Sequence, residues 1–534
     1  MTEDKFQIVI NWDPSSMWHA IFTAADKQDP DSKEIQSMLE SIVDEHGRAG
    51  VDTLVHCVWA GFQTLMMSCQ TSDSYDAPYE PPYDSGKHEV FVRHAEHGTF
   101  LAKIASGGTD FIDILLQQCR RNGMRFVAGL RMNDRHAGSG QCPLLYPHVQ
   151  KMVDANPEWH LKEFPGGLNY KYDGVRDAVL SFVEEFLERH DVDGLEFDWM
   201  RWCHVFTTSE AVEHAPYLTD FTRKARHLLD AAADRRGRDR LVLGVRIPSN
   251  LDECRGLGYD VAAWVDEELV DYLCPSDFYY TDFNCQVDDF VTLTEGTACR
   301  VYPSIHPKSA THNRAWLLGP EHYRAAAKNF YAFGAHGVSP YNYQHHWDSP
   351  VLPNPKGDSG PIDMWPTAMR YLTELTNITS IDARERHYLY HPLWSEHAEG
   401  HSPTLAYENH RIILDHSTGD SCGSFRFRLA EMVADEAISA TLMFKVTYMI
   451  EADALEIRLN DHVISPASID KQWHLGQSPA KGRPLGQYFQ FRIPLTAPPV
   501  VFGDNVLTVR LANRVGMPRR MLNVQEFEVK VDMK

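Results

Sequence analysis

The sequence lacks several features that would place it in large functional classes. It contains no run of 18 apolar residues and no apolar stretch directly after Met1, so neither a membrane-spanning helix nor a signal peptide is predicted. Basic residues are outnumbered, 51 against 74 acidic ones, and the resulting net charge of -23 disfavours a nucleic acid or an anionic membrane as the partner. We therefore expect a protein that binds neither.

Cysteine is also scarce, and the usual cofactor motifs are missing. The ten cysteines form no Cys-x-x-Cys pair, which fits a reducing compartment, so we expect a cytoplasmic protein; removal of a leader would instead make it secreted or periplasmic. There is no Gly-rich phosphate loop and no His-Glu-x-x-His motif, so we predict no cofactor and no metal. The 27 histidines, among them His88, His94 and His97, leave a metal-dependent lyase or hydrolase as an alternative.

The composition that remains is that of a folded globular chain. Hydrophobic residues make up 43% and charged residues 23% of 534 residues, enough for two or three domains with their own cores. Up to about residue 380, short β-branched runs alternate with amphipathic helical stretches, the pattern of a parallel sheet with helical crossovers. Eight such runs predict an α/β fold, a (β/α)8 TIM barrel over residues 1–380: Phe6–Asp13, Val51–Trp59, Arg125–Asn133, Val192–Met200, Leu241–Pro248, Val270–Asp277, Val301–His306 and Gly337–Asn342.

The helical period fades after about Ser380, and short alternating segments replace it. Their spacing is typical of a β-sandwich, and we predict a jelly-roll-like accessory domain over residues 381–534. This domain could bind sugar, mediate formation of a homo-oligomer, or only cover the barrel, and we favour the structural role. The predicted strands are Arg411–Asp415, Ser424–Leu429, Ala440–Met449, Leu455–Asn460, Tyr488–Ile493, Asn505–Leu511 and Phe527–Val531.

The fourth predicted strand of the barrel carries the strongest chemical signal. Because side chains alternate along a strand, Gly194, Glu196 and Asp198 share one face, while Leu195, Phe197 and Trp199 share the other. The apolar set should face the outer helices, so that both carboxyl groups point into the barrel, with Asp198 nearer its mouth. Burial of two carboxyl groups costs free energy, so they need either charged or hydrogen-bonding partners or a functional role.

Arginines on the flanking strands are the expected partners. The same alternation points Arg131 and Arg246 into the barrel on either side of Glu196 and Asp198, and Arg201 follows the fourth strand. Three interpretations stay open: a structural ion network, cations that keep Asp198 ionised, and an arginine that binds an anionic group of the substrate.

These motifs resemble a known group of proteins. The run Asp193–Arg201, with Arg131–His136 and Asn156–Trp159, is similar to the glycosyl-hydrolase-like TIM-barrel group called family-10-like, and the likeness covers roughly residues 5–380. The resemblance implies a carbohydrate-active hydrolase. An Asp at the end of the fourth strand and another at the end of the sixth, here Asp198 and Asp277, also resemble the arrangement in retaining α-galactosidases.

Hydrolysis of a glycoside usually needs one carboxylate and one protonated acid. Asp198 is the candidate nucleophile or base. Candidates for the acid are Asp277 first, Glu196 second and Asp134 third. Further residues at strand ends are candidate contacts for sugar hydroxyls or, in the plainer interpretation, parts of the barrel mouth: Asp13, Trp59, Asn133, His136, Tyr279, His306, Tyr341 and Asn342.

The predicted function is therefore hydrolysis of a glycosidic bond in an oligosaccharide. Long, aromatic loops after the second, third and eighth strands favour a pocket and exo action, and the three arginines favour acidic or sulfated sugars. The alternatives are a carbohydrate-binding barrel without catalysis and the metal-dependent lyase or hydrolase named above.

Overall fold

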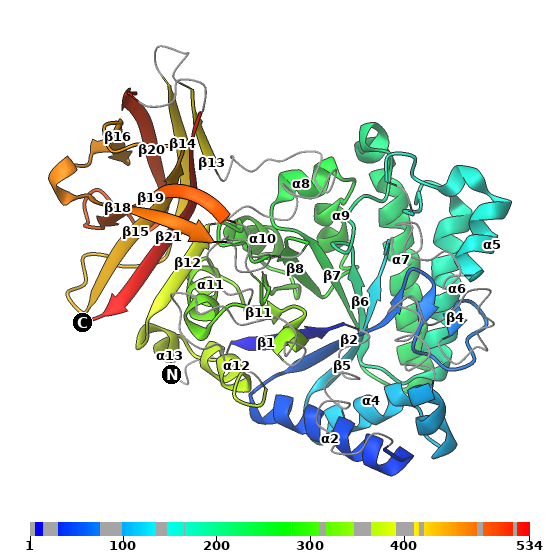
Figure 1. The fold of residues 1–534 in the computed structure, drawn as a ribbon. Helices are drawn as coiled ribbons and strands as arrows, with labels where there is room; N and C mark the ends of the chain where they lie inside the picture. The colour runs from blue at the N-terminus through cyan, green and yellow to red at the C-terminus, as the bar shows by residue number, and fades with distance from the viewer. Residues whose placement is uncertain are drawn as a thin grey trace.

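The computed structural model combines a barrel with two antiparallel sheets (Figure 1). It describes residues 6–13, 30–74, 99–134, 147–164, 166–278, 280–308, 317–346, 365–390, 411–415, 421–477, 484–515 and 521–534. None of the helices in these ranges is both long and apolar enough to cross a membrane.

The barrel strands follow one another around a closed parallel sheet. The first six are β1 (Gln7–Trp12), β2 (Thr53–Ala60), β5 (Arg125–Arg131), β6 (Gly194–Asp198), β7 (Val242–Pro248) and β8 (Tyr272–Ser276). The seventh strand is split into β9 (Arg300–Val301) and β10 (Ser304–Ile305), of which the first pairs with β8 and the second with β11 (Gly337–Pro340). Because β11 also pairs with β1, the sheet closes, and the predicted TIM barrel is confirmed.

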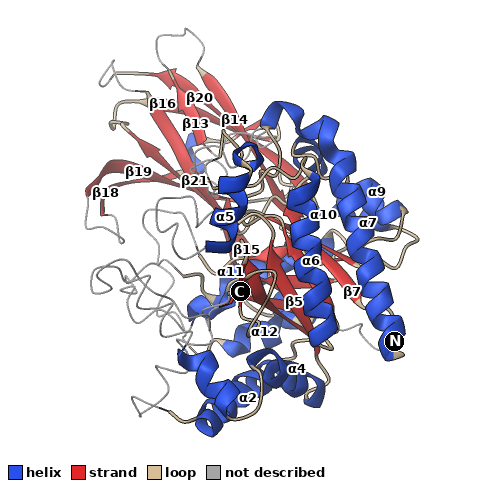
Figure 2. Ribbon diagram, turned by 90° about the vertical axis from the view of Figure 1, so that its right-hand side faces the viewer, coloured by secondary structure: helices blue, strands red, loops and turns tan. Residues whose placement is uncertain are grey.

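Helices with clear start and stop signals cover the outside of the barrel (Figure 2). Asp31 caps the first covering helix with a complete capping box, and Gly237, at φ 60°, ends the longest one in the left-handed conformation that glycine adopts without strain. The main helices are α2 (Ser32–Arg48), α4 (Phe111–Arg121), α5 (Pro147–Ala155), α6 (Asp173–Arg189), α7 (Ala211–Arg236), α8 (Leu251–Gly256), α9 (Val261–Asp266), α10 (Val287–Thr294), α11 (Pro320–Ala332), α12 (Met369–Leu375) and α13 (Ile378–Asp382).

The barrel interior is apolar at its base and polar toward the carboxyl ends of the strands. A small cluster of buried apolar side chains, separate from the main core, fills the base: Val9, Val55, Val127, Tyr272, Cys274 and Tyr302. The ring of Tyr272 reaches across β7 at Gly244, where a Cβ atom would lie only 2.0 Å from that ring. Glycine at position 244 therefore gives the Tyr272 hydroxyl access to the polar layer above.

The C-terminal part forms two antiparallel sheets, as expected for a β-sandwich. One sheet has the order β12-β21-β15-β19-β18 with β13 also paired to β21, and the other has the order β14-β20-β16-β17. Every predicted strand of this part is present, and three further ones, β12, β17 and β18, are found in the described ranges. The strands are β12 (Arg386–Tyr390), β13 (Arg411–Leu414), β14 (Cys422–Leu429), β15 (Ile438–Thr447), β16 (Ala454–Leu459), β17 (His462–Val463), β18 (Asp470–Gln477), β19 (Pro484–Pro494), β20 (Gly503–Asn513) and β21 (Leu522–Met533).

The sandwich contacts the barrel through the end of β14. Asn329 of α11 donates to the carbonyl of Arg428 at 2.9 Å and accepts from the Ala430 amide at 2.9 Å. The Arg428 guanidinium binds both carboxylate oxygens of Asp288 on α10 at 2.7 Å. These polar contacts hold β14 against α10 and α11.

Candidate active site

Asp198 lies at the carboxyl end of β6 and is held by three hydrogen bonds. Its Oδ1 accepts from Arg246 Nη1 at 2.7 Å and from the Arg201 amide at 3.0 Å, and its Oδ2 accepts from the Tyr341 hydroxyl at 2.8 Å. Burial raises the pKa of Tyr341 above its usual range, so this phenol stays a neutral donor. All three partners of Asp198 are hydrogen-bond donors, and one of them is a cation.

Arg246 connects two of the strand-end acids. It is fully buried on β7, opposite Asp198 in the sheet register, and its guanidinium lies 3.6 Å from the centre of the Tyr341 ring. Besides Asp198 it binds Ser276 Oγ at 3.0 Å and the backbone carbonyls of Asp277 at 2.7 Å and Phe278 at 3.1 Å. One cation thus fixes Asp198 and the backbone of Asp277 in the same part of the barrel mouth.

Arg131 has a different anionic partner. It lies opposite Asp198 on β5, but its Nη2 forms an ion pair with Asp13 Oδ2 at the end of β1, at 2.7 Å. The same nitrogen is 3.3 Å from the Tyr341 hydroxyl and 3.4 Å from Asn342 Oδ1. Asp13, Tyr341 and Asn342 are therefore linked to Asp198 through one chain of polar contacts.

Glu196 lies one layer deeper than Asp198, about 7 Å away along the strand between Cα atoms. Its two oxygens accept from Asn11 Nδ2 at 2.7 Å and from the Tyr272 hydroxyl at 3.0 Å. Burial and, second, the charge of Asp198 raise the pKa of Glu196 to about 7, against the weaker opposing effect of the Tyr272 hydrogen bond. Its contacts with the barrel interior make Glu196 a less suitable acid for a substrate bound at the mouth.

The raised pKa of Glu196 makes a testable contribution to stability. The unfolded chain releases this proton near pH 4.5 and the folded protein near pH 7, so the contribution is present below pH 4.5 and is lost as the pH rises to 7. Glutamine has no proton to release, so Glu196→Gln does not lose stability in this way as the pH rises. We expect the free energy of unfolding of the variant, relative to wild type, to rise by up to about 3 kcal/mol between pH 4.5 and pH 8.

Urea unfolding of both proteins across this pH range measures the effect. Glu213→Gln, on an exposed part of α7, is the control and should show a difference that does not change with pH. A difference between Glu196→Gln and wild type that stays constant with pH would contradict the raised pKa.

The other candidate residues at the mouth lie around this centre. Asp277 is 3% exposed, and its Oδ2 accepts from the Tyr280 amide at 3.1 Å. His306 Nε2 is 3.1 Å from Ser276 Oγ and 3.4 Å from Arg246 Nη2. Asp134 Oδ2 lies 3.8 Å from Arg201 Nε, and the Arg201 guanidinium lies over the Trp202 and Phe278 rings.

Two candidates from the sequence lie elsewhere. Trp59 is fully buried, with its ring stacked on Phe182 of α6 and its Nε1 bonded to Ser72 Oγ, because a bulge between Cys57 and Trp59 breaks the alternation of β2. Asn133 uses its amide to bind the backbone of Leu168 and His204, which fixes two loops. We therefore leave both out of the proposed site.

Three residues of the site were not predicted from the sequence, and several predicted ones lie outside the described ranges. Asn11, Tyr272 and Ser276 were not singled out, although all three occupy inward positions of predicted strands, a signal that was available. His136 and Tyr279, both predicted contacts, lie outside the described residues, as do the loop histidines His88, His94 and His97. Among the residues that are described, no three His, Cys, Asp or Glu side chains gather as a metal site.

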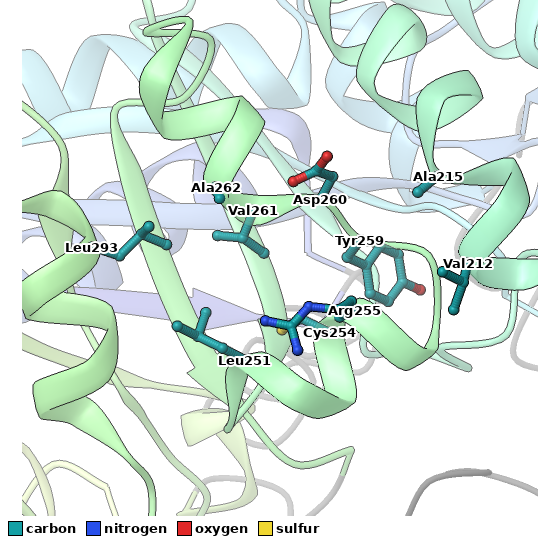
Figure 3. Close-up of a pocket in the computed structure, with 10 residues that line it drawn as sticks. All are labelled: Val212, Ala215, Leu251, Cys254, Arg255, Tyr259, Asp260, Val261, Ala262 and Leu293. Atoms are coloured by element: carbon teal, nitrogen blue, oxygen red, sulfur yellow. The ribbon is translucent and has the colours of Figure 1, made fainter.

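A cavity of about 330 Å³ is lined by residues of the outer helices and their connecting loops (Figure 3). Residues of α7, α8, α9 and α10 contribute to its wall, and neither Asp198 nor Asp277 does. The lining residues are Val212, Ala215, Leu251, Cys254, Arg255, Tyr259, Asp260, Val261, Ala262 and Leu293. We therefore locate the candidate active site at the barrel mouth and not in this cavity.

Comparison with known proteins gives a distant structural likeness only. No family model and no curated protein matches the chain. Among solved structures, a GH138 enzyme targeting pectin rhamnogalacturonan II is 11% identical with a TM-score of 0.40, and the match covers 71% of this chain and 39% of that one. The PgaB glycoside hydrolase domain from Bordetella bronchiseptica is 12% identical with a TM-score of 0.37, over 65% of this chain and 96% of that one.

A third structure, described only as a glycoside hydrolase, is 10% identical with a TM-score of 0.36, and the match covers 96% of this chain and 93% of that one. The chain is thus distantly similar to TIM-barrel glycoside hydrolases, with no specific family assigned. The finer resemblance to the family-10-like group stays a prediction.

Proposed function

We propose that the protein is a glycoside hydrolase that uses Asp198 as nucleophile or base and Asp277 as acid. The observation that carries this proposal is the arrangement around Arg246, which binds the carboxylate of Asp198 directly but only the backbone of Asp277. A cation in direct contact thus stabilises negative charge on Asp198. Two acids with different environments at one mouth are what glycoside hydrolysis requires.

The proposed substrate is an oligosaccharide that carries acidic or sulfated sugars and is cleaved from one end. Both acids lie at the carboxyl ends of barrel strands, where loops of TIM-barrel enzymes bind their substrates. Asp13, Tyr341 and His306 offer an acceptor, a phenol and an imidazole near Asp198 for sugar hydroxyls.

One observation favours a second candidate, a carbohydrate-binding barrel without catalysis. The side chain of Asp198 is only 4% exposed, and both of its oxygens already accept hydrogen bonds from the protein. A carboxylate held in this way could serve only to fix Arg246 and Tyr341. A nucleophile must instead expose one lone pair to the sugar, and the free lone pair on Oδ2 is the one left for this role.

A hydrolysis screen separates the two candidates. Wild type and Asp198→Asn are incubated with neutral, uronic and sulfated oligosaccharides, and new reducing ends and released monosaccharides are measured. We expect wild type to release single sugars from an acidic substrate and the variant to release none. Binding of the same oligosaccharides without any product from wild type would favour the binding barrel.

A further inference from the structure

The three arginines of the barrel mouth differ in their burial and in the ion pairs that they form. The side chain of Arg246 is 1% exposed and that of Arg131 is 4% exposed, and each forms an ion pair at 2.7 Å. Arg201 keeps 12% of its side chain exposed, and the carboxylate oxygen nearest to it in the described part of the chain, Asp134 Oδ2, lies 3.8 Å from Nε, beyond hydrogen-bond distance. Arg201 is thus the cation whose hydrogen-bonding capacity is least used.

The guanidinium of Arg201 donates no side-chain hydrogen bond to any residue in the described ranges. Its Nε is buried without a hydrogen-bond partner in this part of the chain. Removing a cation from water without giving it acceptors costs free energy, and a ligand that supplies acceptors recovers that cost. The lack of acceptors for the Arg201 guanidinium points to an anionic group of a bound ligand.

The protein nevertheless holds this guanidinium in place. It lies 4.7 Å from the centre of the Trp202 ring and 5.0 Å from that of Phe278, and the two rings are themselves 5.5 Å apart. Trp202 has a φ of 64°, a left-handed conformation that strains a bulky residue, and this turn brings its ring beside Arg201. Aromatic faces orient a guanidinium without using its hydrogen-bond donors, so the planar fork stays available.

Arg201 is also close to the proposed chemistry. Its backbone amide donates to Asp198 Oδ1 at 3.0 Å, which fixes the start of the side chain beside the reacting carboxylate. Asp134 faces the Nε edge, so an anionic ligand would approach the edge formed by the two terminal nitrogens. That edge presents two parallel donors, which match two oxygens of a carboxylate or a sulfate group.

We propose that Arg201 is the specificity-determining residue of the site and binds the carboxylate or sulfate of an acidic sugar next to the cleaved bond. The inference rests on the proposed function and adds the residue that would select acidic sugars. Charge alone is not sufficient, because a lysine has a single ammonium group and cannot form the paired contact. A substrate without an acidic group that displaced water from the two terminal nitrogens of Arg201 would leave them without acceptors.

Calorimetric titration tests the proposal without requiring turnover. Wild type, Arg201→Met and Arg201→Lys are titrated at low salt with D-glucuronate, D-galacturonate and D-galactose 6-sulfate, and with neutral D-glucose and D-galactose. We expect wild type to prefer an acidic sugar over its neutral counterpart by at least about tenfold. This preference should fall at least about tenfold in Arg201→Met and be recovered only in part by Arg201→Lys.

The outcomes separate carboxylate from sulfate and specificity from catalysis. Preference for glucuronate or galacturonate identifies a uronic acid site, and preference for galactose 6-sulfate identifies a sulfated one. Equal or absent binding of all five sugars to wild type overturns the proposal, as does a preference that survives in Arg201→Met. If the acid preference depends on Arg201 but no oligosaccharide is hydrolysed, the proposed hydrolase fails and the anion site stands.

Circular dichroism and thermal unfolding of the variants exclude a folding defect. If Arg201→Met does not fold, Arg201→Gln replaces it, because glutamine keeps one donor and loses the charge and the fork. Cleavage of a neutral glycoside with the same efficiency as its acidic counterpart would leave the hydrolase intact and remove the role of Arg201.

Discussion

We expect Asp198→Asn to lower kcat/KM on the oligosaccharide identified in the hydrolysis screen by about 1000-fold or more, while the protein stays folded. In the proposed mechanism the carboxylate either attacks the sugar carbon or takes a proton from water, and an amide does neither at a useful rate. Asn keeps the shape of the side chain and one oxygen, which can still accept from Arg246, now at 2.7 Å from the carboxylate. The loss should therefore appear in kcat more than in KM.

Two controls exclude a nonspecific effect of the substitution and a loss of substrate binding. Asp252→Asn changes a carboxylate whose side chain is 77% exposed on α8, and it should leave kcat/KM unchanged. The affinity of Asp198→Asn for the intact substrate, measured by calorimetry, should stay within about tenfold of wild type. Full activity of Asp198→Asn would remove this residue from the mechanism and leave the second candidate function, or another acid, to explain the site.

The central residues of the site could be predicted because a parallel barrel follows simple periodicity. Alternation on the fourth strand gives Glu196 and Asp198 a common face, and in-register pairing with the neighbouring strands brings Arg131 and Arg246 to the level of Asp198. Neither step needs knowledge of side-chain conformation. The strand boundaries and the β-sandwich follow from the same kind of pattern.

The partners of these residues could not be predicted, because they depend on positions across the barrel. Arg131 is opposite Asp198 in the register, yet its ion pair is with Asp13, since a long side chain at a barrel mouth can reach either neighbour. The Tyr272 hydroxyl reaches Glu196 only because Gly244 leaves the space free. Such contacts are set by packing and closure of the barrel, not by a local sequence pattern.

Local irregularities account for the position of Trp59 and for two of the strands that were not predicted. Trp59 was expected at the active face, but a bulge in β2 shifts the alternation and turns its ring toward α6. The strands β17 and β18 have weak signals: the first has two residues, and the second, Asp470–Gln477, mixes charged, amide and aromatic residues with a glycine. In each case the sequence lacks the regular two-residue alternation from which strands and inward-facing positions are predicted.

Arg246→Met should be the most destabilising of the substitutions considered, with a loss of about 3–5 kcal/mol in the free energy of unfolding. Methionine fills part of the space but has neither the positive charge nor the hydrogen-bond donors of the guanidinium. The carboxylate of Asp198 would stay buried without its cation, and the carbonyls of Asp277 and Phe278 would lose their donor. Urea unfolding measures the loss, and Arg255→Met, at a side chain that is 71% exposed, should change stability by less than about 0.5 kcal/mol.

A double-mutant cycle shows whether this loss arises from the ion pair. If the unpaired Asp198 carboxylate accounts for much of it, Asp198→Asn should offset part of the damage in the Arg246→Met background, with a coupling energy of about 1–3 kcal/mol. Strictly additive losses would mean that Arg246 acts mainly through the two carbonyls and the Tyr341 ring, 3.6 Å from its guanidinium. In that case the cation would be a structural clamp of the barrel mouth, and the carboxyl group of Asp198 would be held mainly by its other two donors, the Tyr341 hydroxyl and the Arg201 amide.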